Sequence, residues 1–473
     1  MEAGRFEEAL ALAEDAVAGA RTCVPAHGFL ASVLLKLGRT PDAEHVIARA
    51  SDLGTGVADA YDGLAFVAMA LGLHARSNEL YRRATQVAPA DPRFWYNLAC
   101  SERSLGRLVE AEVACDHAIG LDGSQYASHL LRSELGVQSP ESNHIRELEA
   151  ALARAGDDYR ARVFLGYALA KELDDLGRFD EAFHWFSRAA NARRARLEYD
   201  VAMDERKLLR IAEVYSHHRR VGSRTADPRS VDSSRYIFII GLPRSGTTLV
   251  ERILSALPGV RANGETDHFS RALLAAARGA GDVFARAAAA DPEAVATGYA
   301  RLAEPGVPAE FIIEKMPLNY LYVGAIRQAL PNAKIVLVSR QPLDSCFAMY
   351  RTLFAAGYPF SYDLADLGRY YAAYRQLMNH WHAGDAEPLH QVVYEDLVRE
   401  PRPNGMLIAQ HCGLKWSDSA IEIQNNTSVS LTASAAQVRR PIYGSSSGRW
   451  QHYRHHLGVL IDTLRRLGVA LPA

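Results

Sequence analysis

Small residues recur with a fixed period in the first half of the chain. Gly4, Gly38, Gly72 and Gly106 stand 34 residues apart, and Gly177 follows about two periods later. Alanines follow these glycines at fixed offsets of five and twelve residues: Ala9, Ala16, Ala43, Ala50, Ala84, Ala111, Ala118, Ala182 and Ala189. Because residues seven apart share one face of a helix, the pattern predicts closely packed helix pairs with glycine in the turn between them.

Large side chains accompany two of these glycines at characteristic spacings. They are Trp95, Leu98 and Ala99 before Gly106, and Tyr81 and Pro89 after Gly72. With the period, this arrangement resembles the tetratricopeptide repeat, a helical hairpin that stacks into a solenoid. The resemblance covers about residues 1–200 and implies a surface that binds a peptide or protein. The alternative role is a spacer or a dimerisation element, which would make the protein a homodimer.

The pattern changes after residue 215. Residues 216–233 are polar and contain Gly, Pro and several Ser, which predicts a linker. Beyond them, short apolar runs alternate with helical stretches: the runs are Tyr236–Ile240, Ile335–Val338 and Gln391–Val393, and the stretches are Thr247–Leu257 and Asp344–Phe354. This alternation predicts a parallel sheet with crossover helices. We therefore expect a helical array over residues 1–215, a linker over 216–233 and an α/β domain over 234–473.

The composition limits which partners and which cellular compartment we expect for the protein. The 473 residues carry a net charge of −2, so there is no global electrostatic reason to bind nucleic acid or an anionic membrane. The five cysteines are widely spaced and form no CxxC pair, which argues against both a disulfide framework and a zinc site. No apolar run approaches the length of a membrane span, and the chain starts with an acidic amphipathic segment. We expect a soluble, cytoplasmic protein with neither nucleic acid nor membrane as a partner.

The segment YIFIIGLPRSGTTLVERIL, residues 236–254, reads as a buried strand, a tight loop and a helix. Backbone amides in such a loop and the positive end of the helix bind phosphate-like oxygens. An ordinary nucleotide triphosphatase or P-loop kinase would have lysine at position 247, where this chain has threonine. This loop places its cation earlier, at Arg244. The predicted anion-binding residues of this loop are Arg244, Ser245, Gly246, Thr247 and Thr248.

The strand, the Pro-x-Ser-Gly-Thr-Thr loop and the helix resemble the element with which sulfotransferases grip the 5′-phosphosulfate of PAPS (3′-phosphoadenosine 5′-phosphosulfate). The version Pro-Arg-Ser-Gly-Thr-Thr is similar to that of the tyrosylprotein sulfotransferases. The resemblance extends over about residues 234–455, with further segments in family order. It implies an α/β sulfotransferase domain of P-loop-like type with a parallel sheet, placed after an all-α repeat solenoid.

Several later residues match the family's nucleotide-binding positions. Arg340 follows an apolar strand, and the resemblance implies that it holds the 3′-phosphate. The family's serine eight residues later is Ala348 here, and Ser345 is the candidate substitute because it lies one helical turn earlier. In SSSGRW, residues 445–450, Arg449 matches the basic residue that closes over the 3′-phosphate, and the basic residue Arg439 precedes this loop. Tyr394 in YEDLV matches a tyrosine that lines the nucleotide pocket; its alternative role is packing on the core.

Two segments supply the predicted chemistry. Glu265 in RANGETDHF stands where the tyrosylprotein sulfotransferases carry their glutamate base, and a carboxylate suits deprotonation of an acceptor hydroxyl. His268 is the rival base, and Asp267 replaces an arginine that is frequent in the family. Lys315 in IIEKMPLNY matches the family's Lys-x-Pro, whose lysine neutralises the bridging oxygen as the nucleotide leaves. Arg244, with Lys315, is expected to neutralise the sulfuryl oxygens.

The expected activity is transfer of a sulfuryl group from PAPS to a hydroxyl, with 3′-phosphoadenosine 5′-phosphate as the second product and no metal. The acceptor expected is a tyrosine in a peptide or protein held by the repeats. A carbohydrate or small-molecule acceptor is the alternative within the same class of enzyme. A repeat scaffold that binds nucleotide without turnover is the alternative outside it, because Ala348 and Asp267 depart from the family pattern.

Overall fold

The computed structural model describes residues 3–221, 226–227, 231–304, 309–354, 357–383, 389–426, 428–430, 432, 434–444 and 446–472. Backbone contacts divide the chain into two compact units. The first, here called the repeat unit, comprises Met1–Leu176 and Thr427–Ser430. The second, here called the sheet unit, comprises Gly177–Asn426 and Leu431–Ala473. The division lies before the predicted linker, residues 216–233.

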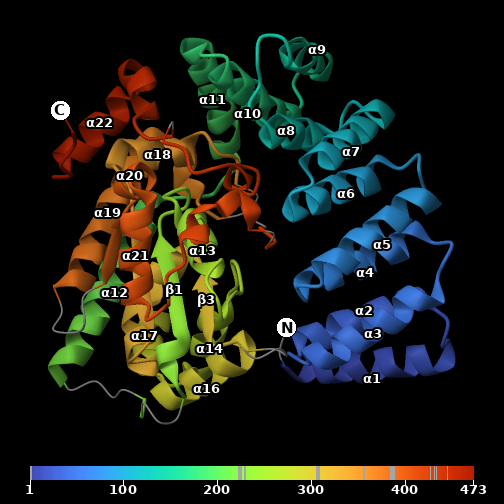
Figure 1. The fold of residues 1–473 in the computed structure, drawn as a ribbon, viewed down its shortest axis with the longest axis horizontal. Coiled ribbons are helices and arrows are strands. Elements are labelled where there is room, and N and C mark those ends of the chain that lie inside the picture. Colours follow the sequence, from blue (N-terminus) through green and yellow to red (C-terminus); the bar gives the residue numbers. More distant parts are fainter. Residues whose placement is uncertain are drawn as a thin grey trace. The chain divides into compact units, whose positions relative to one another are not determined.

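The repeat unit is a succession of antiparallel helices (Figure 1). They are α1 (Ala3–Gly19), α2 (Val24–Lys36), α3 (Thr40–Leu53), α4 (Ala58–Ala70), α5 (His74–Val87), α6 (Pro92–Leu105), α7 (Leu108–Leu121), α8 (Tyr126–Leu135), α9 (Ile145–Ala155) and α10 (Tyr159–Asp175). Gly38, Gly72 and Gly106 occupy the turns of the pairs α2/α3, α4/α5 and α6/α7, with φ of 74°, 79° and 81°. Because this left-handed backbone suits glycine, the period marks the turns of the hairpins.

The periodic alanines form the tight contacts between paired helices. Ala50, Ala84, Ala111 and Ala118 are fully buried in the repeat unit. The first helix differs, because Ala16 is exposed while Leu10 and Ala13 of the same helix are buried. Helix α1 packs on α2 through this other face, so the alanine pattern predicts the buried face from α3 onward and not in α1.

The sheet unit contains a five-stranded parallel sheet in the order β2-β3-β1-β4-β5. Its neighbouring strands β1 and β3 are labelled in Figure 1. The strands are β1 (Tyr236–Gly241), β2 (Val260–Ala262), β3 (Phe311–Lys315), β4 (Lys334–Ser339) and β5 (His390–Val393). Phe238 of β1 pairs with Glu314 of β3 and with Ile335 of β4. All residues of β1 are buried, since β1 is central and both of its faces are covered.

Helices precede, connect and follow the strands. They are α11 (Phe179–Arg194), α12 (Val201–Val221), α13 (Thr247–Ser255), α14 (His268–Ala276), α15 (Val283–Ala288), α16 (Pro292–Ala303), α17 (Val323–Ala329), α18 (Pro342–Tyr350), α19 (Leu364–His382), α20 (Tyr394–Arg399), α21 (Pro401–His411) and α22 (Gly458–Arg466). The 3₁₀ segments are η1 (Ser233–Arg235), η2 (Pro317–Tyr322), η3 (Pro359–Tyr362), η4 (Asp418–Ile421), η5 (Ile423–Asn425), η6 (Gln437–Arg439) and η7 (Arg449–His456). The apolar side of α13 packs on the sheet through Val250, Ile253 and Leu254.

Helices α11 and α12 are built into the sheet unit. Arg194 of α11 pairs with Asp366 of α19 at 2.9 Å. The ring of Tyr215 in α12 packs against Gly324 of α17, where there is no room for a Cβ. Helix α12 continues to Val221, through the first residues of the predicted linker. Residues 222–225 and 228–230 of that linker lie outside the described residues.

Within the described residues, no helix combines the length and the apolar character needed to span a membrane.

Candidate active site

One edge of the sheet gathers residues that the sequence singles out from five separate segments. In a parallel sheet, the carboxyl ends of all strands lie at the same edge, where α/β folds bind ligands. Each strand is followed there by a predicted site residue. These are Arg244 after β1, Glu265 after β2, Lys315 at the end of β3, Arg340 after β4 and Tyr394 after β5.

The loop between β1 and α13 is held by contacts that require glycine at both ends. A Cβ on Gly241 would lie 2.5 Å from the carbonyl oxygen of Val338 in the adjacent strand β4. At Gly246, where φ is 105°, a Cβ would overlap the ring of Tyr394. The loop therefore lies directly against the ends of β4 and β5.

Polar groups of this loop are left for a ligand. The Oγ atom of Ser245 is buried and has no hydrogen-bond partner among the described residues. The amide N–H groups of Gly246, Thr247 and Thr248 at the start of α13 likewise have no acceptor within the described part of the chain. Buried donors are rarely unpaired, and donors at a helix start favour an anion. These groups fit a phosphate or sulfate group in the loop.

Arg244 adopts left-handed backbone, with φ of 66°, at the tip of the loop. Its guanidinium donates hydrogen bonds to the Oγ of Ser434 and, at 3.0 Å, to the Oε1 of Gln437. The side chain is therefore directed to the segment around η6. Thr248 lies near the same segment, with its Oγ1 3.5 Å from that of Thr432.

Arg340 connects the loop after β1 to the segment before η7. Its guanidinium donates to the carbonyl oxygen of Arg244 at 3.1 Å and to that of Ser446. It lies over the ring of Tyr394, 4.9 Å from the centroid, and the hydroxyl of Tyr394 is 2.6 Å from the Oγ of Ser446. Burial lowers the pKa of Arg340 from its ordinary value. The structure thus brings Arg244, Arg340 and Tyr394 together.

The segment that carries Arg449 is fastened to the start of α18. The carboxylate of Asp344 accepts hydrogen bonds from the amides of Gly448 at 2.6 Å and Trp450 at 3.3 Å. Arg449, between them, is the first residue of η7. Ser345 is buried next to Asp344 in α18, and its amide donates to the carbonyl oxygen of Gln341 at 2.8 Å.

Arg439 lies in a different cluster. Its guanidinium donates to the carbonyl oxygen of Asn426 at 2.9 Å, and Arg252 of α13 donates to the same oxygen at 3.1 Å. Burial lowers the pKa of both arginines, that of Arg252 to about 10. Arg439 therefore shares an acceptor with Arg252 of α13.

Lys315 and Glu265 form an ion pair at the ends of β3 and β2. The Nζ of Lys315 donates to the Oε1 of Glu265 at 2.6 Å, and the Oε2 of Glu251 lies 3.7 Å from the same Nζ. Lys315 is fully buried, whereas the side chain of Glu265 is 35% exposed. Burial raises the pKa of Glu251, while Lys315 opposes this shift. A buried ammonium thus faces one inner carboxylate and one that reaches solvent.

His268, the rival base, faces a buried carboxylate. Its Nδ1 lies 4.0 Å from the Oε2 of Glu314, which accepts a hydrogen bond from Asn319 on its other oxygen. Burial lowers the pKa of His268 to about 4 and raises the pKa of Glu314 to about 7. A neutral imidazole with so low a pKa is a weak base at neutral pH. Asp267 is exposed beside Arg271.

Sequence reasoning missed several residues of this edge. Glu251 and Arg252 are charged yet buried in α13, and the only signal is a charged pair inside the apolar run LVERIL. Gln437 and Ser434, which bind Arg244, lie too far along the chain for a local pattern to show the contact. Tyr358 also has left-handed backbone. The pKa of its phenol is raised mainly by burial and to a lesser extent by the charge of Glu265.

Comparisons with known proteins match two parts of the chain to different families. Residues 236–418 match the sulfotransferase family, and residues 1–65 and 63–125 match tetratricopeptide repeats. A relative named as an uncharacterized protein of Aquifex aeolicus (strain VF5) is 28% identical over 402 residues, which are 82% of this chain and 52% of the relative. Protein-tyrosine sulfotransferase 2 of Gallus gallus is 28% identical over 244 residues, which are 45% of this chain and 62% of that protein. The chain thus spans between about half and two thirds of the length of these two relatives.

Two solved structures are similar in part. One is the sulfotransferase domain from the Synechococcus PCC 7002 olefin synthase. The similarity covers 53% of this chain and 98% of that domain, with 18% identity and a TM-score of 0.36. The other is YrrB, described as a TPR protein with an unusual peptide-binding site. The similarity covers 38% of this chain and 83% of YrrB, with 16% identity and a TM-score of 0.26.

Proposed function

We propose that this chain, which carries tetratricopeptide repeats before a sulfotransferase domain, is an enzyme. The proposed reaction transfers a sulfuryl group from PAPS to the hydroxyl of a tyrosine in a peptide or protein. The observation that carries this proposal is the ion pair between Lys315 and Glu265, 2.6 Å long, at the sheet edge that also holds the anion-binding loop. It combines a cation for a leaving oxygen with a carboxylate for a proton.

The donor site is proposed along the edge formed by the ends of β1, β4 and β5. The Oγ of Ser245 and the amides of Gly246, Thr247 and Thr248 would bind the 5′-phosphosulfate, with Arg244 beside them. The 3′-phosphate and the adenine base would be surrounded by Arg340, Ser345, Tyr394 and Arg449. Arg439 is proposed to contribute long-range charge, because its guanidinium binds the carbonyl oxygen of Asn426 beside Arg252 of α13.

In the proposed reaction, the acceptor oxygen forms a bond to sulfur while the bond from sulfur to the 5′-phosphate oxygen breaks. The hydroxyl proton passes to the carboxylate of Glu265. Lys315 stabilises the negative charge that develops on the departing phosphate oxygen. Because Glu265 reaches solvent and Lys315 is buried, the acceptor would approach from the side of Glu265. The residues required by this scheme are all protein side chains, so it needs no metal.

A peptide or protein acceptor is proposed on account of the repeats. Phe29 of α2 and Phe66 of α4 are 54% and 61% exposed, so the repeat unit offers apolar contacts to a polypeptide. A carbohydrate or a small phenol is the second candidate acceptor, since the described residues at the sheet edge include no feature that selects tyrosine.

The donor assignment predicts the effect of Arg244→Ala. Affinity for 3′-phosphoadenosine 5′-phosphate, measured by calorimetry in the presence of EDTA, should fall by about 2 to 3 kcal/mol, because charge-assisted hydrogen bonds are lost. Arg402→Ala is the matched control, since Arg402 pairs with Asp418 on the surface and should leave affinity unchanged. Equal affinity in wild type and Arg244→Ala, or binding that requires a metal, would overturn the assignment.

A further inference from the structure

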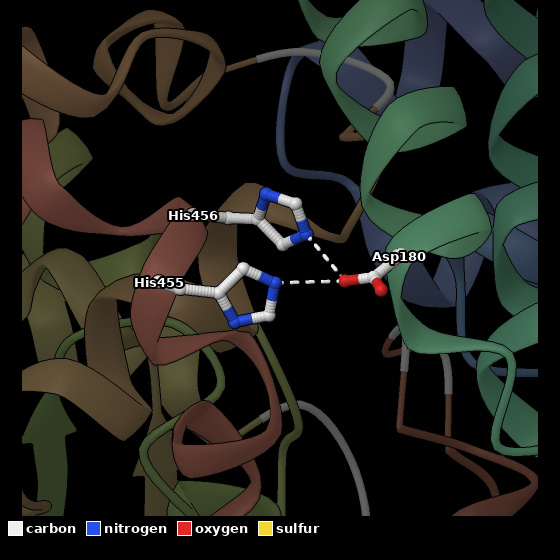
Figure 2. Close-up of side chains that lie close together, drawn as sticks. All are labelled: Asp180, His455 and His456. Carbon is white, nitrogen blue, oxygen red and sulfur yellow. Dashed lines mark hydrogen bonds and ion pairs between the residues drawn. The ribbon is translucent and has the colours of Figure 1, made fainter.

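Three side chains of the sheet unit that can bind a metal converge between α11 and η7. They are Asp180 in the first turn of α11 and the consecutive residues His455 and His456 at the end of η7 (Figure 2). The Nε2 atoms of both histidines lie 2.8 Å from the same oxygen, Oδ1 of Asp180. The three potential ligand atoms all lie within 4.8 Å of one another.

The ring of His456 is held in place by a neighbour that is not a ligand. The ring of His456 stacks on Phe183 of α11, with centroids 4.4 Å apart and planes 4° from parallel. The ring of His455 lies 4.0 Å from that of His456. In the same segment, His452 stacks on Phe179 at 4.3 Å. Rotation of His456 is therefore restricted by packing, which reduces the entropy lost when a ligand binds.

We infer that Asp180, His455 and His456 form a binding site for a divalent transition metal, and specifically for Zn²⁺. Two imidazole nitrogens and one carboxylate oxygen are ligands that Zn²⁺ prefers, and a water molecule would complete a tetrahedral set. Donor atoms around tetrahedral Zn²⁺ lie about 3.3 Å apart for metal–ligand distances near 2.0 Å. Small rotations of the exposed Asp180 and His455 side chains would open the 2.8 Å contacts to that spacing.

Metal binding would exchange the hydrogen bonds of the cluster for coordinate bonds. A metal ligand must offer a free electron pair, so the carboxylate of Asp180 and one ring nitrogen of each histidine would bind without a proton. The metal would thus replace two hydrogen bonds by three coordinate bonds.

The site would connect two segments that are distant in sequence. Asp180 belongs to α11, whereas His455 and His456 end the 3₁₀ segment that starts at Arg449. A metal that binds the folded arrangement more tightly than the unfolded chain stabilises the fold in proportion to its occupancy. The inferred role is therefore a structural clasp between α11 and η7, and it does not depend on the proposed sulfuryl transfer.

The test is a titration of the full chain, without an affinity tag that contains histidine, with ZnCl₂ after removal of metal by a chelator. We expect one Zn²⁺ per chain and a rise in the thermal unfolding temperature. Asp180→Asn and the double variant His455→Ala/His456→Ala should each bind Zn²⁺ about 100-fold more weakly and lose the rise. Co²⁺ in place of Zn²⁺ should give the intense visible absorption of a tetrahedral site in wild type only.

His452→Ala is the matched control, because it removes a histidine of the same 3₁₀ segment that lies outside the cluster. This variant should bind Zn²⁺ as wild type does. The inference is overturned if wild type binds no Zn²⁺ at micromolar concentrations, or if the double histidine variant binds it as tightly as wild type. Equal weakening by His452→Ala and by the double histidine variant would also contradict it, since binding would then not depend on this geometry.

Discussion

Replacing Glu265 by glutamine should lower the turnover number for sulfuryl transfer about 100-fold or more, while donor binding persists. Glutamine keeps the shape of the side chain and its contact with Lys315, but it cannot accept the proton of the acceptor hydroxyl. Because 35% of the Glu265 side chain is exposed, the substitution should leave the core unchanged. Initial rates with labelled PAPS and a tyrosine peptide, together with calorimetry of the nucleotide product, measure both quantities.

His268→Gln is the control for this prediction. The imidazole faces Glu314 at 4.0 Å and has a pKa of about 4, so it should contribute little to proton transfer at neutral pH. We expect this variant to retain turnover within a few-fold of wild type. The opposite pattern, with activity abolished by His268→Gln and retained by Glu265→Gln, would reverse the assignment of the base.

Lys315→Met should reduce turnover about 1,000-fold, because the charge on the departing phosphate oxygen would lose a buried cation. Methionine has a similar length and keeps the apolar contacts of the lysine stem. Pre-steady-state measurement with saturating donor and acceptor should show that the loss lies in the transfer step. Turnover within tenfold of wild type would contradict a role for Lys315 at the leaving oxygen.

Loss of the lysine also leaves Glu251 without its buried cation. Since burial already raises the pKa of Glu251, this carboxyl should take up a proton in Lys315→Met, with some loss of stability. The double variant Lys315→Met/Glu251→Gln replaces this buried carboxyl by a neutral amide and should recover stability. Recovery of stability without recovery of turnover separates the chemical role of Lys315 from its structural role.

The strand ends explain why several residues singled out from the sequence lie together in the structure. Arg244, Lys315 and Arg340 each stand at the end of a short apolar run or in a loop of recognisable spacing. A parallel sheet then brings the ends of such runs to one edge, whatever the length of chain between them. The short strand β2, over Val260–Ala262, was not predicted because three half-buried residues give no clear alternation.

Contacts between distant segments could not be predicted in this way. Asp344 binds the amides of Gly448 and Trp450, and Arg244 binds Gln437, across long stretches of irregular chain. No period or propensity fixes where such a segment returns to the sheet. The same holds for Asp180 and His455, whose contact depends on how η7 packs on α11.

The compact units also show a limit of composition as a guide to domains. The polar run over residues 216–233 suggests a boundary, yet α11 and α12 lie on the sheet side of the division at Leu176–Gly177. Their attachment rests on individual contacts such as Arg194 with Asp366, and Tyr215 with Gly324. The domain limits drawn from sequence therefore stay a prediction that expression of defined fragments can address.

The most direct test of the central proposal is transfer of labelled sulfate from PAPS by the full chain. Acceptors would be a protein and a peptide that contain tyrosine, the same peptide with phenylalanine in place of tyrosine, a glycan and a simple phenol. The account predicts label on the tyrosine-containing polypeptides, none on the phenylalanine peptide, and at least a 100-fold smaller rate with Glu265→Gln. Transfer confined to the glycan or the phenol would contradict the proposed acceptor, and no transfer to any acceptor despite tight nucleotide binding would contradict the proposed enzyme.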